Sequence, residues 1–337
     1  MLVAHHLASR VLPRHASRFS RKDFTLPQLF ACLVVKEQQK RSYREAEALL
    51  RDADHWCHAI GMRKVPDHNT LCRAADFLLR RCRSGRLLDA LVRYAASARL
   101  LGLSLKPLAG DSSTFERHHV SGHFAERRRR ESRRARRRRM RGRRRDPSAA
   151  LRRLPKLGVA VACHSHLAVG VWCGTGSGSD CAHFEALLFD AWRRVPNRRL
   201  KAAFDAGYDS ESNHRLARQD MGVASIIPPK SGRPTEKPPP TRWRRHMRQL
   251  LKTKASRRRC GYTQRWQAET VISMLKRNLG SALRGKTANS RKRDLMLKVL
   301  THDLMILRSR RGSRQSRMSL LNLTPTPAAG YSPIQTT

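Results

Sequence analysis

The spacing of apolar residues changes near residue 103, and this change constrains the fold more than any other feature of the sequence. Before it, apolar residues recur at helical intervals, as they do over 26–34. After it, short apolar runs alternate with Gly, Pro and Ser, a pattern typical of strands. We therefore expect an all-α region over 25–103 followed by an α/β domain over 104–308.

The α/β domain is expected to contain a mixed sheet. Five apolar runs predict strands, at 105–109, 157–162, 167–172, 202–204 and 223–227. Helices are expected at 181–194, 212–220 and 263–278, and a long connection at 228–258. No helix separates the first three strands, so we expect them to form a meander, whereas the later strands should be parallel.

The all-α region is expected to hold several short helices joined by tight turns. Ser42 and Glu45 have capping-box spacing at the start of one of them, and further helices are expected at 69–80 and 86–100. Short helices with basic surfaces suit a helix-turn-helix-like DNA-binding unit. A generic helical bundle would show the same pattern and remains an alternative.

The charge of the chain points to a polyanionic partner. Lys and Arg number 71 against 25 Asp and Glu, which gives a formal net charge of +46, and nucleic acid is the commonest polyanion. Residues 127–145 hold fourteen Arg and one Glu, a self-repelling insertion that cannot pack in a core. We expect 1–24 to be a disordered basic arm and 309–337 a disordered tail.

Other sequence signals exclude some classes of protein. No apolar run approaches the length of a transmembrane helix, so no membrane association is expected. The eight cysteines form no C-x-x-C pair, which favours a reducing cytoplasm over a disulfide framework. A glycine-rich loop at 174–180 lacks the Lys of a phosphate-binding loop, and Asp180 is expected to cap the helix that follows it. The Cys and His residues of 163–183 match no common zinc spacing.

Two carboxylates follow apolar runs that we expect to be strands. Asp111 comes after the run 105–109, and Asp205 comes directly after 202–204. Open α/β sheets bind ligands at the carboxyl ends of their strands. Aspartate is also a common turn residue, but two carboxylates on adjacent strands could share a divalent cation.

Four functional residues line up in the expected helix 263–278 and just before it. Tyr262, Arg265, Glu269 and Lys276 would share one narrow stripe beside an apolar face if the helix began at Tyr262. An ordinary solvated face, with an ion pair between Arg265 and Glu269, would account for the charges. It would not explain why an aromatic, two basic residues and an acid align.

These residues carry a resemblance to a known family. The spacing Tyr262-x2-Arg265-x3-Glu269-x6-Lys276 resembles the Y-(2)-R-(3)-E-(6)-K signature of bacterial insertion-sequence transposases with a DDE catalytic triad. The segments 205–210 and 109–113 resemble the blocks around the two aspartates of that family. The resemblance extends over about residues 25–308.

The resemblance implies a ribonuclease-H-like catalytic core in which Asp111, Asp205 and Glu269 bind two Mg²⁺ or Mn²⁺ ions. Tyr262, Arg265 and Lys276 would bind DNA and its phosphates. The partners would be double-stranded DNA, both transposon ends and target, and further copies of the chain in a homo-oligomer on DNA. The protein would then act in the bacterial cytoplasm, associated with the nucleoid.

Two other functions remain open on the sequence. A non-enzymatic basic protein could bind nucleic acid and use its acids only as caps and ion pairs. A metal-dependent nuclease could cut DNA without joining the ends to a target.

Overall fold

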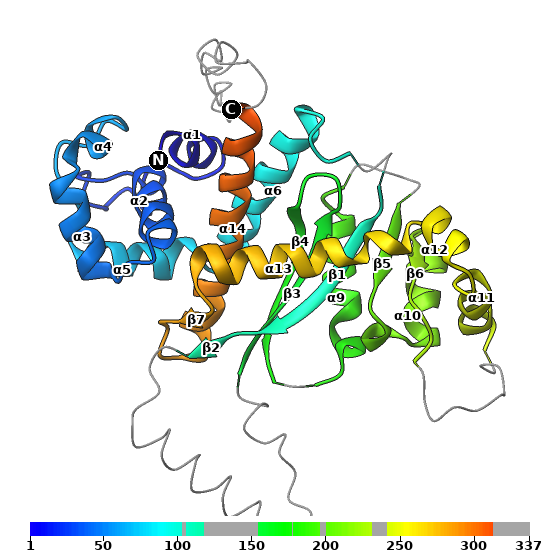
Figure 1. The fold of residues 1–337 in the computed structure, drawn as a ribbon. Helices are drawn as coiled ribbons and strands as arrows, with labels where there is room; N and C mark the ends of the chain where they lie inside the picture. Colours follow the sequence, from blue (N-terminus) through cyan, green and yellow to red (C-terminus); the bar gives the residue numbers. More distant parts are fainter. Residues whose placement is uncertain (103–105, 118–153, 177, 196–199, 231–240, 313–337) are drawn as a thin grey trace, which may run out of the picture.

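The computed structural model describes residues 1–102, 106–117, 154–176, 178–195, 200–230 and 241–312. A helical region precedes a domain built on a central sheet (Figure 1). The insertion 127–145 and residues 313–337 of the expected tail lie outside the described residues. Residues 309–312, which we expected to be disordered, instead continue the last helix, 288–312. The helices of the first region are α1 (Leu2–Ser9), α2 (Leu26–Gln38), α3 (Tyr43–Asp52), α4 (Asp54–His58), α5 (His68–Leu78) and α6 (Arg81–Ser97).

Side-chain caps fix where α2, α3 and α5 begin. The predicted capping box at α3 is confirmed, because Ser42 and Glu45 each accept the other's backbone N–H. A second capping box, which we did not predict, joins Thr25 and Gln28 at the start of α2. Each cap satisfies backbone donors that a helix start leaves unpaired.

The amino-terminal arm differs from the expectation of disorder. Residues 2–9 form helix α1, and the side chains of Ala4, Leu7 and Ala8 are buried in the core of the helical region. These three positions have the i, i+3, i+4 spacing of a helical apolar face. Residues 13–24 carry no helix or strand.

The central sheet has five strands in the order β4-β3-β1-β5-β6. β1, β3 and β4 pair antiparallel, and β5 and β6 continue the sheet parallel to β1. The predicted meander and the predicted parallel strands are both confirmed. The bounds are β1 (Leu108–Thr114), β3 (Pro155–Ala162), β4 (Leu167–Thr175), β5 (Lys201–Phe204) and β6 (Ala224–Ile226); β2 (Glu116–Arg117) and β7 (Ala282–Leu283) form a separate parallel pair.

Helices cover both faces of the sheet. Side chains alternate between the two faces along each strand, and the strands carry apolar side chains on both. Ala160 and Ala162 of β3 pack in the cluster that holds α9, whereas Val159 and Val161 pack in the cluster that holds α13 and α14. The covering helices are α9 (Phe184–Trp192), α13 (Trp266–Leu279) and α14 (Ala288–Gly312). The 3₁₀ turn η1 (Asp180–His183) leads into α9, and α10 (Glu211–Arg215) is followed by a π-helical turn, η3 (Leu216–Asp220).

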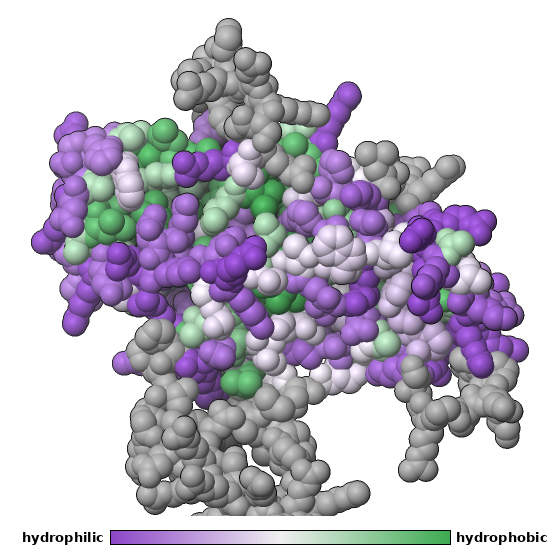
Figure 2. All heavy atoms as spheres, in the orientation of Figure 1, coloured by the Kyte–Doolittle hydropathy of each residue, from purple (hydrophilic) through white to green (hydrophobic). Residues whose placement is uncertain are grey.

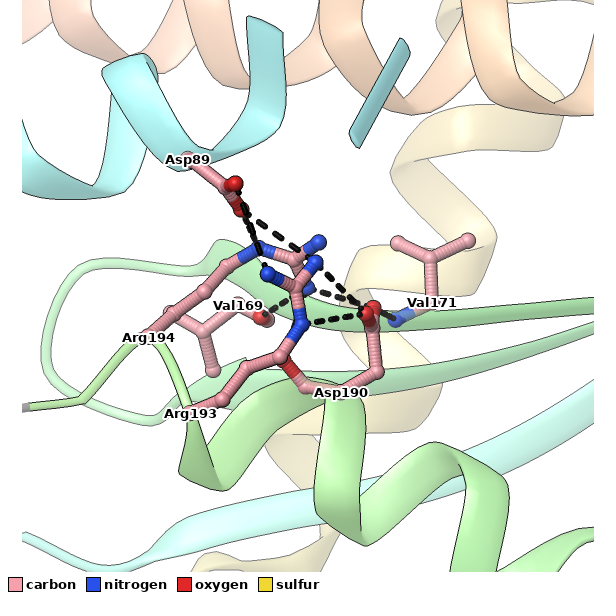
Figure 3. Close-up of polar contacts among 6 residues, drawn as sticks. All are labelled: Asp89, Val169, Val171, Asp190, Arg193 and Arg194. Carbon is pink, nitrogen blue, oxygen red and sulfur yellow. Dashed lines mark hydrogen bonds and ion pairs between the residues drawn. The ribbon is translucent and has the colours of Figure 1, made fainter. Parts of the chain in front are cut away.

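Two sets of contacts tie the helical region to the sheet domain. α14 contributes Leu295 to the cluster that holds α13, and it contributes Leu300 to the cluster that holds α9, which also contains the core of the helical region. In addition, Asp89 of α6 pairs with Arg193 and Arg194, which follow α9 (Figure 3). The helical region is therefore docked on the sheet domain.

The segment 228–258 contains more structure than a connection. Helices α11 (Arg242–Leu250) and α12 (Lys254–Cys260) occupy its second half and lie beside β6 at one end of the sheet (Figure 1). Within 241–260, only two buried apolar side chains, Met247 and Leu251, signal this packing in the sequence. Among the helices of the described residues, none is long and apolar enough to cross a membrane.

Candidate active site

The two aspartates lie at matching positions of adjacent strands. β1 and β5 run parallel with Gly110 opposite Phe204, and each aspartate is the next residue along its strand. Asp111 is still inside β1, which continues to Thr114 against β3, so it marks the end of the parallel pairing rather than the end of the strand. The structure thus places Asp111 and Asp205 side by side on adjacent strands, as the sequence predicted.

A glycine makes this close approach possible. The ring of Phe204 lies against the Cα of Gly110, where an added Cβ would overlap the ring atoms. Any larger residue would push β5 away from β1. Position 110 therefore requires glycine for packing, and the next residue, Asp111, lies beside β5.

Glu269 comes from the helix that packs across β1. Ala268 and Ile272, the neighbours of Glu269 on α13, are buried in the cluster that also holds Ala109 of β1. The side chain of Glu269 itself is 52% exposed and forms an ion pair with Arg265 at 2.5 Å. α13 thus places the third acid over the strand that carries Asp111.

The pKa of Asp111 responds to the charges of the other two acids. The pKa of Asp111 is raised to about 6, mainly because its carboxyl group is buried, and the charges of Glu269 and Asp205 raise it further. A hydrogen bond from the Ser112 N–H and the charge of Arg265 lower that pKa, but by less. Asp111 is thus a buried acid that needs more positive charge than the described side chains give it.

The basic and aromatic residues of the predicted stripe lie around the acids in two groups. Tyr262 and Arg265 form the 3₁₀ turn η4 before α13, so they do not continue its stripe as a regular helix would. Lys276, two turns further along α13, donates to Ser113 of β1 at 2.7 Å and lies over the ring of Phe115. Gly261, next to Tyr262, lies against Pro107 just before β1, whereas Lys276 contacts β1 near its end, and the expected helix begins about three residues late.

An open pocket of about 500 Å³ lies between β1 and α13. Asp111, Glu269 and Lys276 line it. Its remaining lining residues are Ser113, Ile272, Ser273 and Arg277. The pocket combines two acids and two basic side chains, so it suits a phosphate group bound together with a cation.

The donor set fits a hard divalent cation, although the side chains have not converged on one point. Carboxylate oxygens are the ligands that Mg²⁺ prefers. Within the ranges that the structure describes, no three His, Cys, Asp or Glu side chains are close enough together to hold a metal ion. Glu269 lines the pocket, but its carboxylate is paired with Arg265 rather than directed to Asp111. The Cys and His residues of 163–183 form no zinc site in the described part of the chain either.

Asp180 has a position that the sequence did not predict. The hydroxyl of Ser179, not its own carboxylate, accepts the N–H at the start of η1. Asp180 accepts hydrogen bonds from Lys156 at 2.6 Å and from Ser112 at 2.7 Å, and its carboxylate packs against Gly207 of the turn after Asp205. We call the bonded trio of Lys156, Asp180 and Ser112 the brace.

The brace supports both aspartates from behind the sheet. Ser112 follows Asp111 and points to the opposite face, because neighbouring strand residues alternate. Cys181, next to Asp180, donates through its thiol to the carbonyl of Gly207. The strand end of one aspartate and the turn of the other are therefore held by the same few residues. Contacts between positions 68 apart leave no local pattern in a sequence.

A comparison with protein families agrees with this geometry. The family model described as "Transposase DDE domain" matches residues 107–304, which include Asp111, Asp205 and Glu269. Searches of curated proteins and of solved structures found no match. Because the model covers more than half of the chain, the protein belongs to the transposase DDE domain family.

Proposed function

We propose that this chain is the transposase of a bacterial insertion sequence, which cuts the ends of its element and joins them to target DNA. The mixed sheet, preceded by the helical region, is consistent with a ribonuclease-H-like transposase core. The observation that carries the proposal is the register of β1 and β5, which aligns Asp111 with Asp205 under the helix that holds Glu269. It would act on chromosomal DNA in the bacterial cytoplasm, as a homo-oligomer.

Asp111, Asp205 and Glu269 would hold two Mg²⁺ or Mn²⁺ ions. Bound ions of this kind activate the attacking oxygen and stabilise the leaving oxygen in phosphoryl transfer. The raised pKa of Asp111 supports this assignment, because its carboxylate is more stable next to added positive charge. Glu269 would have to leave Arg265, and an exposed ion pair of this kind contributes at most about 1 kcal/mol.

The basic residues around the pocket would hold the DNA. Arg265 is planar and always charged, so it can form two hydrogen bonds with one phosphate once Glu269 has turned away. Lys276 lines the pocket and is held in place by Ser113. Tyr262 is half-buried beside Arg265, where its ring would contact the sugar–phosphate backbone.

The two alternative functions differ in what they require of the acids. A protein that only bound nucleic acid would gain nothing from a buried carboxylate such as Asp111 next to the phosphates. A nuclease without strand transfer would need the same three acids, and the products of the reaction separate it from a transposase. Joined DNA is expected only from a transposase.

The test is the substitution Glu269→Gln, which keeps the size of the side chain and removes its charge. Divalent-dependent cleavage of a duplex that carries the element ends should fall by several orders of magnitude, because metal ligation contributes several kcal/mol to such reactions. DNA affinity should stay the same or rise. Glu185→Gln is the matched control, since Glu185 is an exposed acid in the first turn of α9, on the opposite face of the sheet. Wild-type cleavage by Glu269→Gln would refute the proposed mechanism.

A further inference from the structure

Helices α11 and α12 form a basic surface at one end of the sheet. Residues 241–260 contain nine Lys and Arg and no Asp or Glu. Eight of the nine are exposed: Arg242, Arg245, Arg248, Lys252, Lys254, Arg257, Arg258 and Arg259. Figure 2, in the orientation of Figure 1, shows that hydrophilic side chains dominate this end of the molecule. We call α11 and α12 together the basic unit.

The basic unit is a folded part of the domain, with one face buried and one face charged. Met247 and Leu251 are buried, and Leu251 packs against Ala203 of β5 and Ile226 of β6. Arg245 and Arg248 lie about one turn apart on α11, and both are exposed. The charges therefore project from a rigid support rather than from a free loop.

A buried ion pair fixes the basic unit to the turn after Asp205. The side chain of Asp209 is fully buried and pairs with Arg244 of α11 at 2.8 Å. The carboxylate of Glu211 accepts the first N–H groups of α11, from Trp243 and Arg244. Since Asp209 is only four residues beyond Asp205, the basic unit and the second catalytic aspartate share one rigid connection.

The exposed charges of this surface are not neutralised by the protein. In the described part of the chain, no carboxylate forms an ion pair with any of its eight exposed basic side chains, whereas Arg193, Arg284 and Arg293 elsewhere each have at least one such partner. Like charges packed along two short helices repel one another. A bound polyanion would remove this cost, and the regular phosphates of a DNA backbone match a row of basic side chains.

We infer that the basic unit binds the phosphate backbone of duplex DNA beside Asp111 and Asp205, where the parallel pairing of β1 with β5 ends. This inference rests on the proposed function, in that the DNA held at the catalytic pocket would extend across α11 and α12. The contact is independent of sequence, because backbone phosphates carry no base information. Its anchor at Asp209 would keep the bound DNA in a fixed position relative to Asp205.

The experiment compares two double variants of the full chain that remove the same charge. Arg245→Gln with Arg248→Gln tests the basic unit. Lys201→Gln with Arg215→Gln is the control, because both of its residues are exposed, and Lys201 lies at the amino end of β5, away from Asp205. Affinity for a short duplex of random sequence is measured over a salt series, without divalent cations, so that binding is observed apart from cleavage.

The first variant should bind more weakly, and its slope of log affinity against log salt should decrease by about 1.8, since each lost phosphate contact accounts for about 0.9. The control should keep the wild-type slope. Equal slopes in the two variants would overturn the inference, and so would tighter binding of single-stranded RNA than of duplex DNA by the wild type. Loss of the proposed function, seen as absent cleavage at every divalent concentration, would leave this binding result unaffected.

Discussion

Replacing Asp111 by Asn should abolish cleavage and, at neutral pH, make the protein more stable. The carboxyl group is buried, and its pKa is raised from 3.8 to about 6 in the folded state. Because the folded-state pKa is above the unfolded-state value, the folded protein holds this proton more tightly. The corresponding stability is present below pH 4 and is lost as the pH rises through about 6.

The size of the effect follows from the shift. At pH 8 the ionised Asp111 costs about 3 kcal/mol, at pH 5 about half of that, and at pH 4 only about 0.5 kcal/mol. An asparagine side chain would avoid this cost while keeping an oxygen for the Ser112 N–H. Urea unfolding of the Asp111→Asn variant should therefore show a stabilisation that decreases steadily between pH 8 and pH 4.

Asp209 provides the control, because it is also a buried aspartate of the same sheet edge but is paired with Arg244. Asp209→Asn should lose about 1–3 kcal/mol at pH 8, the cost of leaving a partly buried partner unsatisfied. If Asp111→Asn destabilised the protein as Asp209→Asn does, or stabilised it equally at all pH values, the argument that Asp111 is an uncompensated acid would be refuted. In the wild type, cleavage at low Mg²⁺ should rise with pH through about 6, and more Mg²⁺ should move that midpoint to lower pH.

Three further predictions concern other parts of the molecule. Arg194→Met should cost about 3–5 kcal/mol in urea unfolding, because Arg194 is buried in its ion pairs (Figure 3), whereas Arg193→Met at the exposed edge should cost under about 1 kcal/mol. Ser112→Ala removes one bond of the brace, so it should raise the Mg²⁺ concentration for half-maximal cleavage without changing DNA affinity; an unchanged Mg²⁺ requirement would show that the brace does not position Asp111. Deleting 127–145 should reduce the salt dependence of DNA binding, and an unchanged slope would mean that these arginines do not contact DNA.

The sheet could be predicted from sequence because its signals are local. Each strand is a short apolar run between chain breakers, and the absence or presence of an intervening helix decides antiparallel or parallel pairing. The proximity of Asp111 and Asp205 followed from the same reasoning. The bounds were less accurate, because β1 continues past its apolar residues to Thr114 through pairing with β3.

The parts that could not be predicted depend on contacts between distant residues or on weak apolar patterns. The brace joins Lys156, Asp180 and Ser112, which have no common motif. Met247 is the buried residue of α11, and the other positions are mostly polar or basic, so the sequence shows no apolar periodicity that would predict this helix. Gly261 has a positive φ, which ends α12, so the chain begins a separate 3₁₀ turn at Tyr262 before α13.

The acids on the two faces of β1 differ in whether a basic side chain neutralises them, and this difference indicates where a ligand would bind. On one face, Asp180 has the ammonium group of Lys156 at 2.6 Å, so the acid is neutralised inside the protein. On the other face, Lys276 donates to Ser113 and not to Asp111, whose pKa remains high. A sequence shaped only by stability would gain by pairing Asp111 as it pairs Asp180. The described side chains leave Asp111 short of positive charge, and under the proposed function a divalent cation between it, Asp205 and Glu269 would supply that charge.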